Sequence, residues 1–493
     1  MPDASAPADL IEMGAAALAD RLAAGEVTAE AATAAHLERI AAVNAPVNAI
    51  VTLRDPEDCL AEARAADAAR ARGEALGPLA GLPIAVKDLA PTAGLRTTLG
   101  SPLFAEWVPE ADGALAAKLK AAGAIVIGKT NTPEFGLGSH TFNEVFGATR
   151  NPWNPALTAG GSSGGGSVAA AMRMLPMADG SDMMGSLRNP AGWANIFGFR
   201  PSWGRVPNAD AADLYAHQLS TNGPMGRRVA DVALLLDALA GYDARAPLSL
   251  GEPTGFRAAL AGAEGAARGL RIGWMGDWNG RWPMEPGILA TCERALAVFE
   301  ALGAEVVPLV PDHDFDAIWE SWTTLRSWFV AAKHGPDLDD PARRDRIKPE
   351  AVWEIERGRA LSAMDVHRAV VMRADWHRTL ERVSAEADLL AAPSAQTWPF
   401  PVEWRYPEEI AGRAMDTYHR WMEVMLPASL SGRPAISAPA GFSGAEARAP
   451  GLPIGLQLIG RGRADAEVLR AAAAFEAAAD WVHRTPPEPA AAG

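Results

Sequence analysis

The sequence AGGSSGGGSVAAAMRMLPMADGSDMMGSLRNP, residues 159–190, contains two serines, Ser162 and Ser186, each among glycines and other small residues. Glycine lacks a Cβ atom, so such a segment can adopt positive φ and bring backbone N–H groups close to a ligand. A serine in this setting can act as a nucleophile, and neighbouring N–H groups can stabilise an oxyanion. No histidine lies between His140 and His217. The base for either serine must therefore be another residue type or come from elsewhere in the chain.

Lys87 is the candidate base upstream of this stretch. It follows the apolar run 82–86 in the segment GLPIAVKD, and this run predicts a buried strand that ends at the lysine. Lowering the pKa of a lysine from about 10.4 to about 7 requires roughly 4–5 kcal/mol. Burial or nearby cations can supply that amount, and the end of an apolar strand favours burial. The alternative is a lysine that extends into solvent beside Asp88.

The segments on either side predict an α/β protein. Strand-like runs at 83–86 and 124–127 flank a helical stretch at 115–122, and a helix is predicted over 167–174, after the glycine-rich loop. This order indicates a partly parallel sheet in a layered fold. Two helices are predicted over 9–43 and one over 56–74. Strands at 270–274 and 305–309 flank a helix at 286–302, and residues 313–427 are rich in helix and tryptophan.

These segments together resemble the amidase signature family, the Ser–cis-Ser–Lys hydrolases. GLPIAVKD resembles the family's lysine motif, AGGSSGGGSVAAA its glycine/serine core and DGSDMMGSLRNPA its nucleophile segment. Lys87 and Ser162 are 75 residues apart and Ser162 and Ser186 are 24 apart, as in the family. Further similar segments are 147–155, 198–207, 223–241, 429–439 and 451–460. The resemblance covers most of the chain and is weakest over 253–427.

The resemblance implies an α/β fold: a single large domain with a central mixed β-sheet covered by helices on both faces. We therefore expect one domain over residues 1–493. Its expected parts are an N-terminal helical segment (1–75), a catalytic core (76–250), a helix- and tryptophan-rich substrate-pocket region (251–427) and a return to the core (428–484).

The resemblance also implies roles for the three candidate catalytic residues. Ser186 would be the nucleophile, Ser162 the bridging serine after a cis peptide bond, and Lys87 the base. The oxyanion would be bound by the backbone N–H groups of four consecutive residues, Met183, Met184, Gly185 and Ser186.

Three further residues are expected to support this site. Asp182 and Arg188 flank the nucleophile in a segment that is otherwise small and apolar, so we expect a buried ion pair that stiffens the loop. Ser163 is expected to hydrogen-bond within the site. The family usually has Gly-Gly before the nucleophile, and this chain has Met184-Gly185. We expect Met184 to narrow the acyl side of the pocket; the alternative is a degenerate family member.

Two other interpretations of the glycine-rich segment are open. Gly160-x-Ser162-x-Gly164 matches the nucleophile elbow of α/β-hydrolases, which would make Ser162 the nucleophile of an esterase with an Asp and a His downstream. A flexible Gly/Ser linker is the other alternative. The joint presence of Lys87, Ser162 and Ser186 favours the amidase interpretation over both.

The function expected is an amidase that hydrolyses the C–N bond of a small substrate through an acyl-enzyme. The chain has sixteen tryptophans and four tyrosines. Trp319, Trp322 and Trp398 are candidates for a pocket that binds aryl or hydrophobic groups. A carbamate- or urea-hydrolysing enzyme with the same triad and a non-catalytic binding protein are alternatives. The glutaminase component of tRNA-dependent amidotransferases is a further relative, but its helical region is usually rich in tyrosine.

Composition restricts the partners. The net charge of −15 argues against nucleic acid or an anionic membrane surface. Two cysteines, Cys59 and Cys292, and nine scattered histidines form no disulfide framework or metal motif, so no cofactor or metal is expected. The N-terminus resembles no signal peptide, and no apolar run reaches about 18 residues. We expect a soluble cytoplasmic protein that acts on a small-molecule amide, with a homodimer as an open alternative for its assembly.

Overall fold

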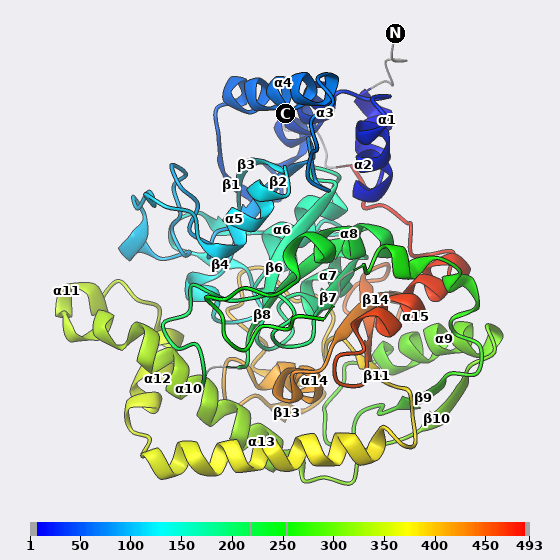
Figure 1. Cartoon of the computed structure of the whole chain (residues 1–493). Coiled ribbons are helices and arrows are strands. Elements are labelled where there is room, and N and C mark those ends of the chain that lie inside the picture. Colours follow the sequence, from blue (N-terminus) through cyan, green and yellow to red (C-terminus); the bar gives the residue numbers. More distant parts are fainter. Residues whose placement is uncertain (1–6, 217, 253–254, 489–493) are drawn as a thin grey trace.

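The computed structural model describes residues 7–216, 218–252 and 255–488. Its centre is an eight-stranded mixed sheet with the strand order β10–β9–β11–β15–β14–β7–β8–β6 (Figure 1). The pairs β10–β9 and β9–β11 are parallel, and the other neighbours are antiparallel. The strands are β6 (Met177–Asp182), β7 (Phe197–Arg200), β8 (Thr221–Gly226), β9 (Arg271–Trp274), β10 (Glu305–Pro308), β11 (Leu389–Pro393), β14 (Ala435–Phe442) and β15 (Pro453–Ile459).

Helices cover both faces of this sheet. On one face α6 (Gly164–Ala171) packs against α7 (Arg188–Ala194), and α7 lies on β7, β14 and β15. On the other face α15 (Asp465–Ala478) packs against α8 (Val229–Leu239) and α9 (Ile288–Ala301). The predicted fold class is thus confirmed. The division of the chain into four parts stays a prediction.

A second, three-stranded sheet carries Lys87. Its order is β1 (Ile50–Leu53), β3 (Ile125–Thr130) and β2 (Pro83–Lys87), with β2 and β3 parallel and α5 (Ala114–Ala121) between them in sequence. All five residues of β2 are buried, as its apolar sequence predicts. The backbone N–H of Lys87 donates to the Asp179 carboxylate on β6 at 3.1 Å. This bond joins the end of β2 to the central sheet.

The N-terminal segment differs from the prediction in two respects. Residues 9–43 fall in three helices rather than two: α1 (Pro7–Glu12), α2 (Ala15–Ala23) and α3 (Ala29–Val43). Gly14 separates the first two with an extended backbone (φ −69°, ψ 158°), and a Cβ atom there would lie 2.6 Å from the Asp231 carboxylate. Strand β1 follows α3 and is not predicted by the sequence pattern, since it is short and only its first residue is buried. The helix α4 (Pro56–Ala71) agrees with the prediction.

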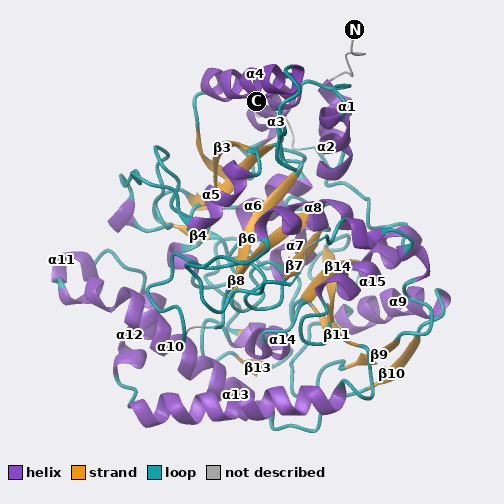
Figure 2. Cartoon of the chain, viewed as in Figure 1, coloured by secondary structure: helices purple, strands orange, loops and turns teal. Residues whose placement is uncertain are grey.

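The region after β10 is a helical layer along one side of the molecule (Figure 2). Within it, α10 (Phe315–Asp339) packs on α12 (Pro349–Arg359) and α13 (Ala363–Val383). The remaining helices and strands of the described chain are α11 (Pro341–Arg344), α14 (Leu426–Ser431), β4 (Phe142–Asn143), β5 (Gly147–Ala148), β12 (Glu409–Ile410) and β13 (Arg413–Ala414). The 3₁₀ turns are η1 (Pro102–Phe104), η2 (Glu134–Gly136), η3 (Ala258–Leu260), η4 (Ala263–Gly265) and η5 (Arg420–Met425). Across the described ranges, no helix has the length and apolar character needed to cross a bilayer.

Candidate active site

Lys87 lies at the centre of a cluster of serine hydroxyls. Its Nζ is 2.8 Å from Ser162 Oγ, 2.9 Å from Ser163 Oγ and 3.1 Å from Ser181 Oγ. The Lys87 side chain is buried, with 1% of its surface exposed. Burial lowers the pKa of Lys87 from 10.5 to about 7, although the carboxylates of Asp179 and Asp182 oppose this shift. Near neutral pH a large fraction of Lys87 is therefore the uncharged amine, which can accept a proton.

The loop that carries Ser162 and Ser163 is held closely by its neighbours. The peptide bond between Gly161 and Ser162 is cis. Gly160 has φ +76°, and a Cβ atom there would lie 2.5 Å from Asn189 Oδ1. Thr141 Oγ1 donates to the carbonyl of Gly160 at 2.8 Å. The helix α6 begins directly after this loop, three residues earlier than predicted.

Ser186 lies in the loop between β6 and α7, on the same cavity as Lys87 and Ser162. It is 8% exposed. The backbone N–H of Ser163 donates to the Ser186 carbonyl at 3.3 Å, so the two serine-bearing loops are joined. In the described part of the chain, no hydrogen bond links the Ser186 hydroxyl to Ser162. Of the two contacts in a Lys–Ser–Ser relay, the one between Lys87 and Ser162 is thus formed, and the one between Ser162 and Ser186 is not.

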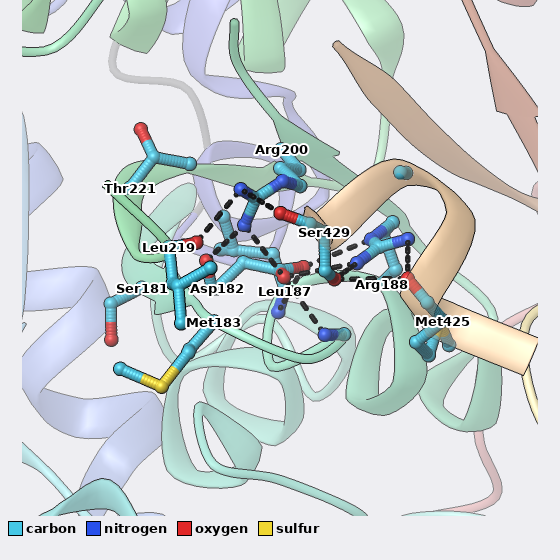
Figure 3. A network of polar contacts seen from close by, with 12 residues as sticks. Ser181, Asp182, Met183, Leu187, Arg188, Arg200, Leu219, Thr221, Met425 and Ser429 are labelled. Atoms are coloured by element: carbon cyan, nitrogen blue, oxygen red, sulfur yellow. Dashed lines mark hydrogen bonds and ion pairs between the residues drawn. The ribbon is translucent and has the colours of Figure 1, made fainter. Parts of the chain in front are cut away.

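Asp182 organises the nucleophile loop through two buried arginines (Figure 3). Arg188 binds the carboxylate with two parallel bonds of 3.0 Å, and Arg200 binds it at 3.2 Å. All three side chains are fully buried. Burial would raise the pKa of Asp182, but the two guanidinium groups hold that pKa well below its usual range. The ion pair between Asp182 and Arg188 fixes the start of the loop to the start of α7.

The amides of the expected oxyanion site fall into two groups. The backbone N–H of Gly185 donates to Asp182 Oδ1 at 2.8 Å, so this amide is already occupied. Among the described residues, the N–H groups of Met183, Met184 and Ser186 have no acceptor. Gly185 has φ +89°, and a Cβ atom there would meet the Met425 side chain at 2.5 Å. Asp182 thus occupies one of the four amides expected to bind the oxyanion, and the role of these amides stays a prediction.

A cavity of about 480 Å³ opens in front of these residues. Its lining is largely aromatic and aliphatic and includes Leu89, Leu99, Trp107, Phe135, Leu137, Met183, Met184, Trp328, Phe329, Val330 and Met422. Met184 is 3% exposed and lies on this wall. Polar side chains that also line the cavity include Asp179, Ser181, Asn222, Arg326 and Lys333. Among the described residues, no three His, Cys, Asp or Glu side chains are grouped as metal ligands.

The three tryptophans expected in the pocket lie elsewhere, which corrects that expectation. The residues of α10 that line the cavity all lie between 326 and 334. Trp322 and Trp319 come one and two turns before Arg326, and both rings pack edge-on against His419 at 5.3 Å. Trp398 is fully buried, and its Nε1 donates to the Pro286 carbonyl at 3.0 Å. Trp107 and Trp328 supply the cavity's indole rings instead.

Several residues of the cavity are not identified by the sequence pattern. Ser181 resembles an ordinary turn residue, although its alternation with Asp179 in a strand places both on one face. Arg326 is 4% exposed and lies between Glu354 at 2.5 Å, Tyr418 at 2.7 Å and the Met183 sulfur at 3.2 Å. No local pattern in α10 distinguishes Arg326 from a surface arginine.

Comparison with known proteins identifies the family. A family model described as amidase matches residues 31–469. A glutamyl-tRNA(Gln) amidotransferase subunit from Moorella thermoacetica is 38% identical over 492 residues, which cover 96% of this chain and 97% of that protein. An acylamidase of Rhodococcus erythropolis is 33% identical, with 96% of each chain covered.

Solved structures agree with these sequence matches. A bacterial aryl acylamidase of the amidase signature family superposes with a TM-score of 0.86 at 29% identity, covering 95% of this chain and 96% of that one. A 6-aminohexanoate cyclic dimer hydrolase in complex with substrate superposes with a TM-score of 0.83 at 26% identity, covering 97% and 99%. This chain belongs to the amidase signature family. It is a hydrolase that acts on C–N bonds.

Proposed function

We propose that this protein hydrolyses small amides with an aryl or otherwise hydrophobic group, with Lys87, Ser162 and Ser186 as its catalytic residues. The observation that carries the proposal is the 2.8 Å contact between a fully buried lysine and Ser162 on the wall of a cavity that also includes Ser186. The lowered pKa of Lys87 supports a role as base, because only the neutral amine can take a proton.

The reaction runs in two halves. Neutral Lys87 takes the proton of Ser162, which takes the proton of Ser186 as the Ser186 oxygen attacks the amide carbonyl. The second hydroxyl contact closes when substrate is bound, as catalytic hydrogen bonds in empty sites often do. The C–N bond then breaks, and the leaving nitrogen receives a proton from Ser162, which regains one from Lys87. Water hydrolyses the acyl-enzyme by the same relay in reverse.

The negative oxygen of the tetrahedral intermediate would be bound by the N–H groups of Met183, Met184 and Ser186. Removing a single donor of this kind typically costs about 10²–10³-fold in rate. The aspartate–arginine cluster described above supports the proposal, because it holds the loop that carries these amides. Gly185 contributes its flexibility at positive φ rather than its N–H group.

The lining of the cavity supports the choice of substrate. Trp107, Phe135 and Trp328 offer aromatic surfaces, and Leu89, Leu99 and Met422 offer aliphatic ones. Apolar pockets of this kind gain affinity by burying hydrophobic groups of a ligand. The aryl acylamidase and the acylamidase named above are relatives whose names fit such substrates.

A second candidate is the glutaminase half of a transamidation, because the Moorella relative is named as part of an amidotransferase and is 38% identical. A binding site for free glutamine needs partners for both a carboxylate and an ammonium group. Arg326 is already paired with Glu354, and the wall beside Ser186 is formed by methionines, whereas Lys333 and Asp179 also line the cavity. The methionine wall at the nucleophile favours the hydrophobic amide, and the substrate panel below decides between the two.

A fluorophosphonate probe and a substrate panel test the proposal. The probe should label Ser186 covalently, and labelling and turnover should both be lost in Ser186→Ala. Labelling that survives Ser186→Ala but not Ser162→Ala would indicate the esterase with a nucleophile elbow. A folded protein that is never labelled would indicate a binding protein.

The panel should contain anilides, aliphatic primary amides, aryl carbamates and glutamine. We expect the highest kcat/KM for anilides. A higher value for carbamates would assign the protein to carbamate hydrolysis, and a higher value for glutamine would assign it to the glutaminase class.

A further inference from the structure

Lys87 has three hydroxyl neighbours, and the relay described above uses only one. Besides Ser162, Ser163 Oγ lies 2.9 Å and Ser181 Oγ 3.1 Å from Lys87 Nζ. Ser163 belongs to the loop before α6, and Ser181 belongs to β6. Within the described residues, Nζ has no other hydrogen-bond partner.

The two protonation states of Lys87 use these neighbours differently. An ammonium has three N–H groups, so all three hydroxyls can accept from it. A neutral amine has two N–H groups and one lone pair, so two hydroxyls accept and the third donates to the lone pair. Only the neutral form is a base, and it acts on Ser162 only if Ser162 is that third hydroxyl.

The proton of Ser163 is already directed away from Lys87. Ser163 Oγ donates to the Ser181 carbonyl at 3.4 Å and accepts from the Ser181 backbone N–H at 3.3 Å. Towards Lys87 it is therefore an acceptor. This leaves Ser162 and Ser181 as the two hydroxyls that could donate to the lone pair.

The distances from Lys87 Nζ to the two hydroxyls distinguish Ser162 from Ser181. Hydrogen bonds that a hydroxyl donates to oxygen are typically about 0.2 Å shorter than those that N–H donates. We therefore assign the shortest contact of Nζ to the hydroxyl that donates. The Ser162 contact is the shortest of the three at 2.8 Å, and the Ser181 contact is the longest at 3.1 Å. This pattern fits Ser162 as the donor and Ser181 as the second acceptor.

We propose that Ser163 and Ser181 are positioning residues that bind the two N–H groups of neutral Lys87 and so direct its lone pair at Ser162. This inference rests on the proposed function, in which Lys87 is the base. Neither serine exchanges a proton. When Lys87 takes the proton of Ser162, the new N–H group points back at the Ser162 oxygen, and the other two hydroxyls keep their bonds.

The packing of β6 holds the two positioning residues together. A Cβ atom on Gly180 would lie 2.6 Å from Ser163 Oγ, so the missing side chain lets Ser163 reach the strand. The two bonds between the Ser163 hydroxyl and the Ser181 backbone then fix the Ser163 hydroxyl against β6. The hydroxyls of Ser163 and Ser181, from different segments, thereby lie on the same strand end beside Lys87 Nζ.

Alanine variants and the pH profile of kcat test the proposal. Ser181→Ala and Ser163→Ala should each lower the high-pH plateau of kcat about tenfold, because the lone pair is no longer directed and one hydrogen bond is lost. The midpoint of the acid limb should move to lower pH, because a charged donor loses more than a neutral one when an acceptor is removed. The double variant should lose about a hundredfold, and Ser181→Thr should stay within about threefold of the natural protein.

Ser167→Ala is the matched control. Ser167 is a buried serine of α6 whose hydroxyl donates to the Gly164 carbonyl at 3.0 Å, away from Lys87. Its replacement should leave the midpoint unchanged. If Ser181→Ala does not fold, Ser181→Cys replaces it, since a thiol fills similar space but is a weak acceptor.

Two results would overturn the proposal. One is a Ser181→Ala enzyme with the natural midpoint and a kcat within twofold of the natural value. The other is a Ser181→Thr enzyme as slow as Ser181→Ala. If Ser186→Ala and Lys87→Ala abolish turnover while the positioning variants have no effect, this inference alone fails. If Lys87→Ala keeps full turnover, the proposed function fails with it.

Discussion

Replacing Lys87 with methionine is expected to abolish turnover and to make the protein harder to unfold below about pH 8. Methionine fills similar space without a charge. Lys87 is 1% exposed, and burial lowers its pKa from 10.5 to about 7. Between these two pH values the unfolded chain binds a proton at this position that the folded chain does not. Folding must expel that proton, so the lysine destabilises the folded state over this range.

The size of the effect follows from the pKa. Each pH unit below 10.5 costs about 1.4 kcal/mol, so the penalty is about 2 kcal/mol at pH 9 and about 3 kcal/mol at pH 8. Below about pH 7 Lys87 is protonated in both the folded and the unfolded chain, and its destabilisation of the folded state levels off between about 4 and 5 kcal/mol. The variant also loses the contacts of Nζ with three hydroxyls, at about 1 kcal/mol each. After this loss of about 3 kcal/mol, the variant is expected to be more stable than the natural protein below about pH 8 and less stable above it. The pH dependence of the difference is unchanged.

Urea unfolding followed by tryptophan fluorescence, at several pH values from 6 to 10, measures this effect. The stability of Lys87→Met relative to the natural protein should fall by about 1.4 kcal/mol per pH unit between 7 and 10. Lys120→Met is the control, because Lys120 is at the surface with Asp112 and is not a buried lysine. A difference between Lys87→Met and the natural protein that does not change with pH would refute the reasoning. It would mean that Lys87 keeps its proton in the folded state.

Three further predictions concern the same site. The value of kcat/KM for an anilide should rise with pH through a midpoint near 7, tenfold per unit below it, because only deprotonated Lys87 is active; a pH-independent profile from 5.5 to 8.5 would contradict this. Asp182→Asn should lower the free energy of unfolding in urea by about 3–5 kcal/mol, since it leaves Arg188 and Arg200 buried without their carboxylate. A loss below about 1 kcal/mol would show that the two buried arginines do not need the carboxylate for stability. Met184→Ala should increase the ratio of kcat/KM for hexananilide to kcat/KM for acetanilide about tenfold, because it removes a buried side chain from the cavity wall. An unchanged ratio would mean that the acyl group binds elsewhere in the cavity. Met422→Ala, on another wall, is the comparison.

The fold could be predicted well where local pattern and burial agree. The apolar run before Lys87 forms a fully buried strand, and the strand–helix–strand units at both ends of the core are present. Strand β1 was missed because its residues are largely half-buried and carry no alternation. The start of α6 was misplaced because three glycines, which disfavour helix, form its first turn.

The site was predictable in its chemistry and less so in its details. The family resemblance implied that Lys87, Ser162 and Ser186 form one site, and the structure brings all three to one cavity. The sequence could not indicate that the Asp182 carboxylate accepts a hydrogen bond from the Gly185 N–H group, because that bond depends on the turn between β6 and α7. The tryptophans of α10 were misassigned for a similar reason. A helix face is readable from sequence, but the point along it where a cavity begins is set by the elements packed against it.

Strand β6 explains why the candidate residues, far apart in sequence, form one site. Its residue Asp179 binds the backbone N–H of Lys87, and its residue Ser181 exchanges two hydrogen bonds with Ser163. Asp182 at its end positions the loop of Ser186. Lys87, the residue next to Ser162 and the loop of Ser186 are therefore each held against one six-residue strand. A base whose proton affinity depends on burial needs this arrangement, because any opening that admitted water would return the lysine towards its charged form.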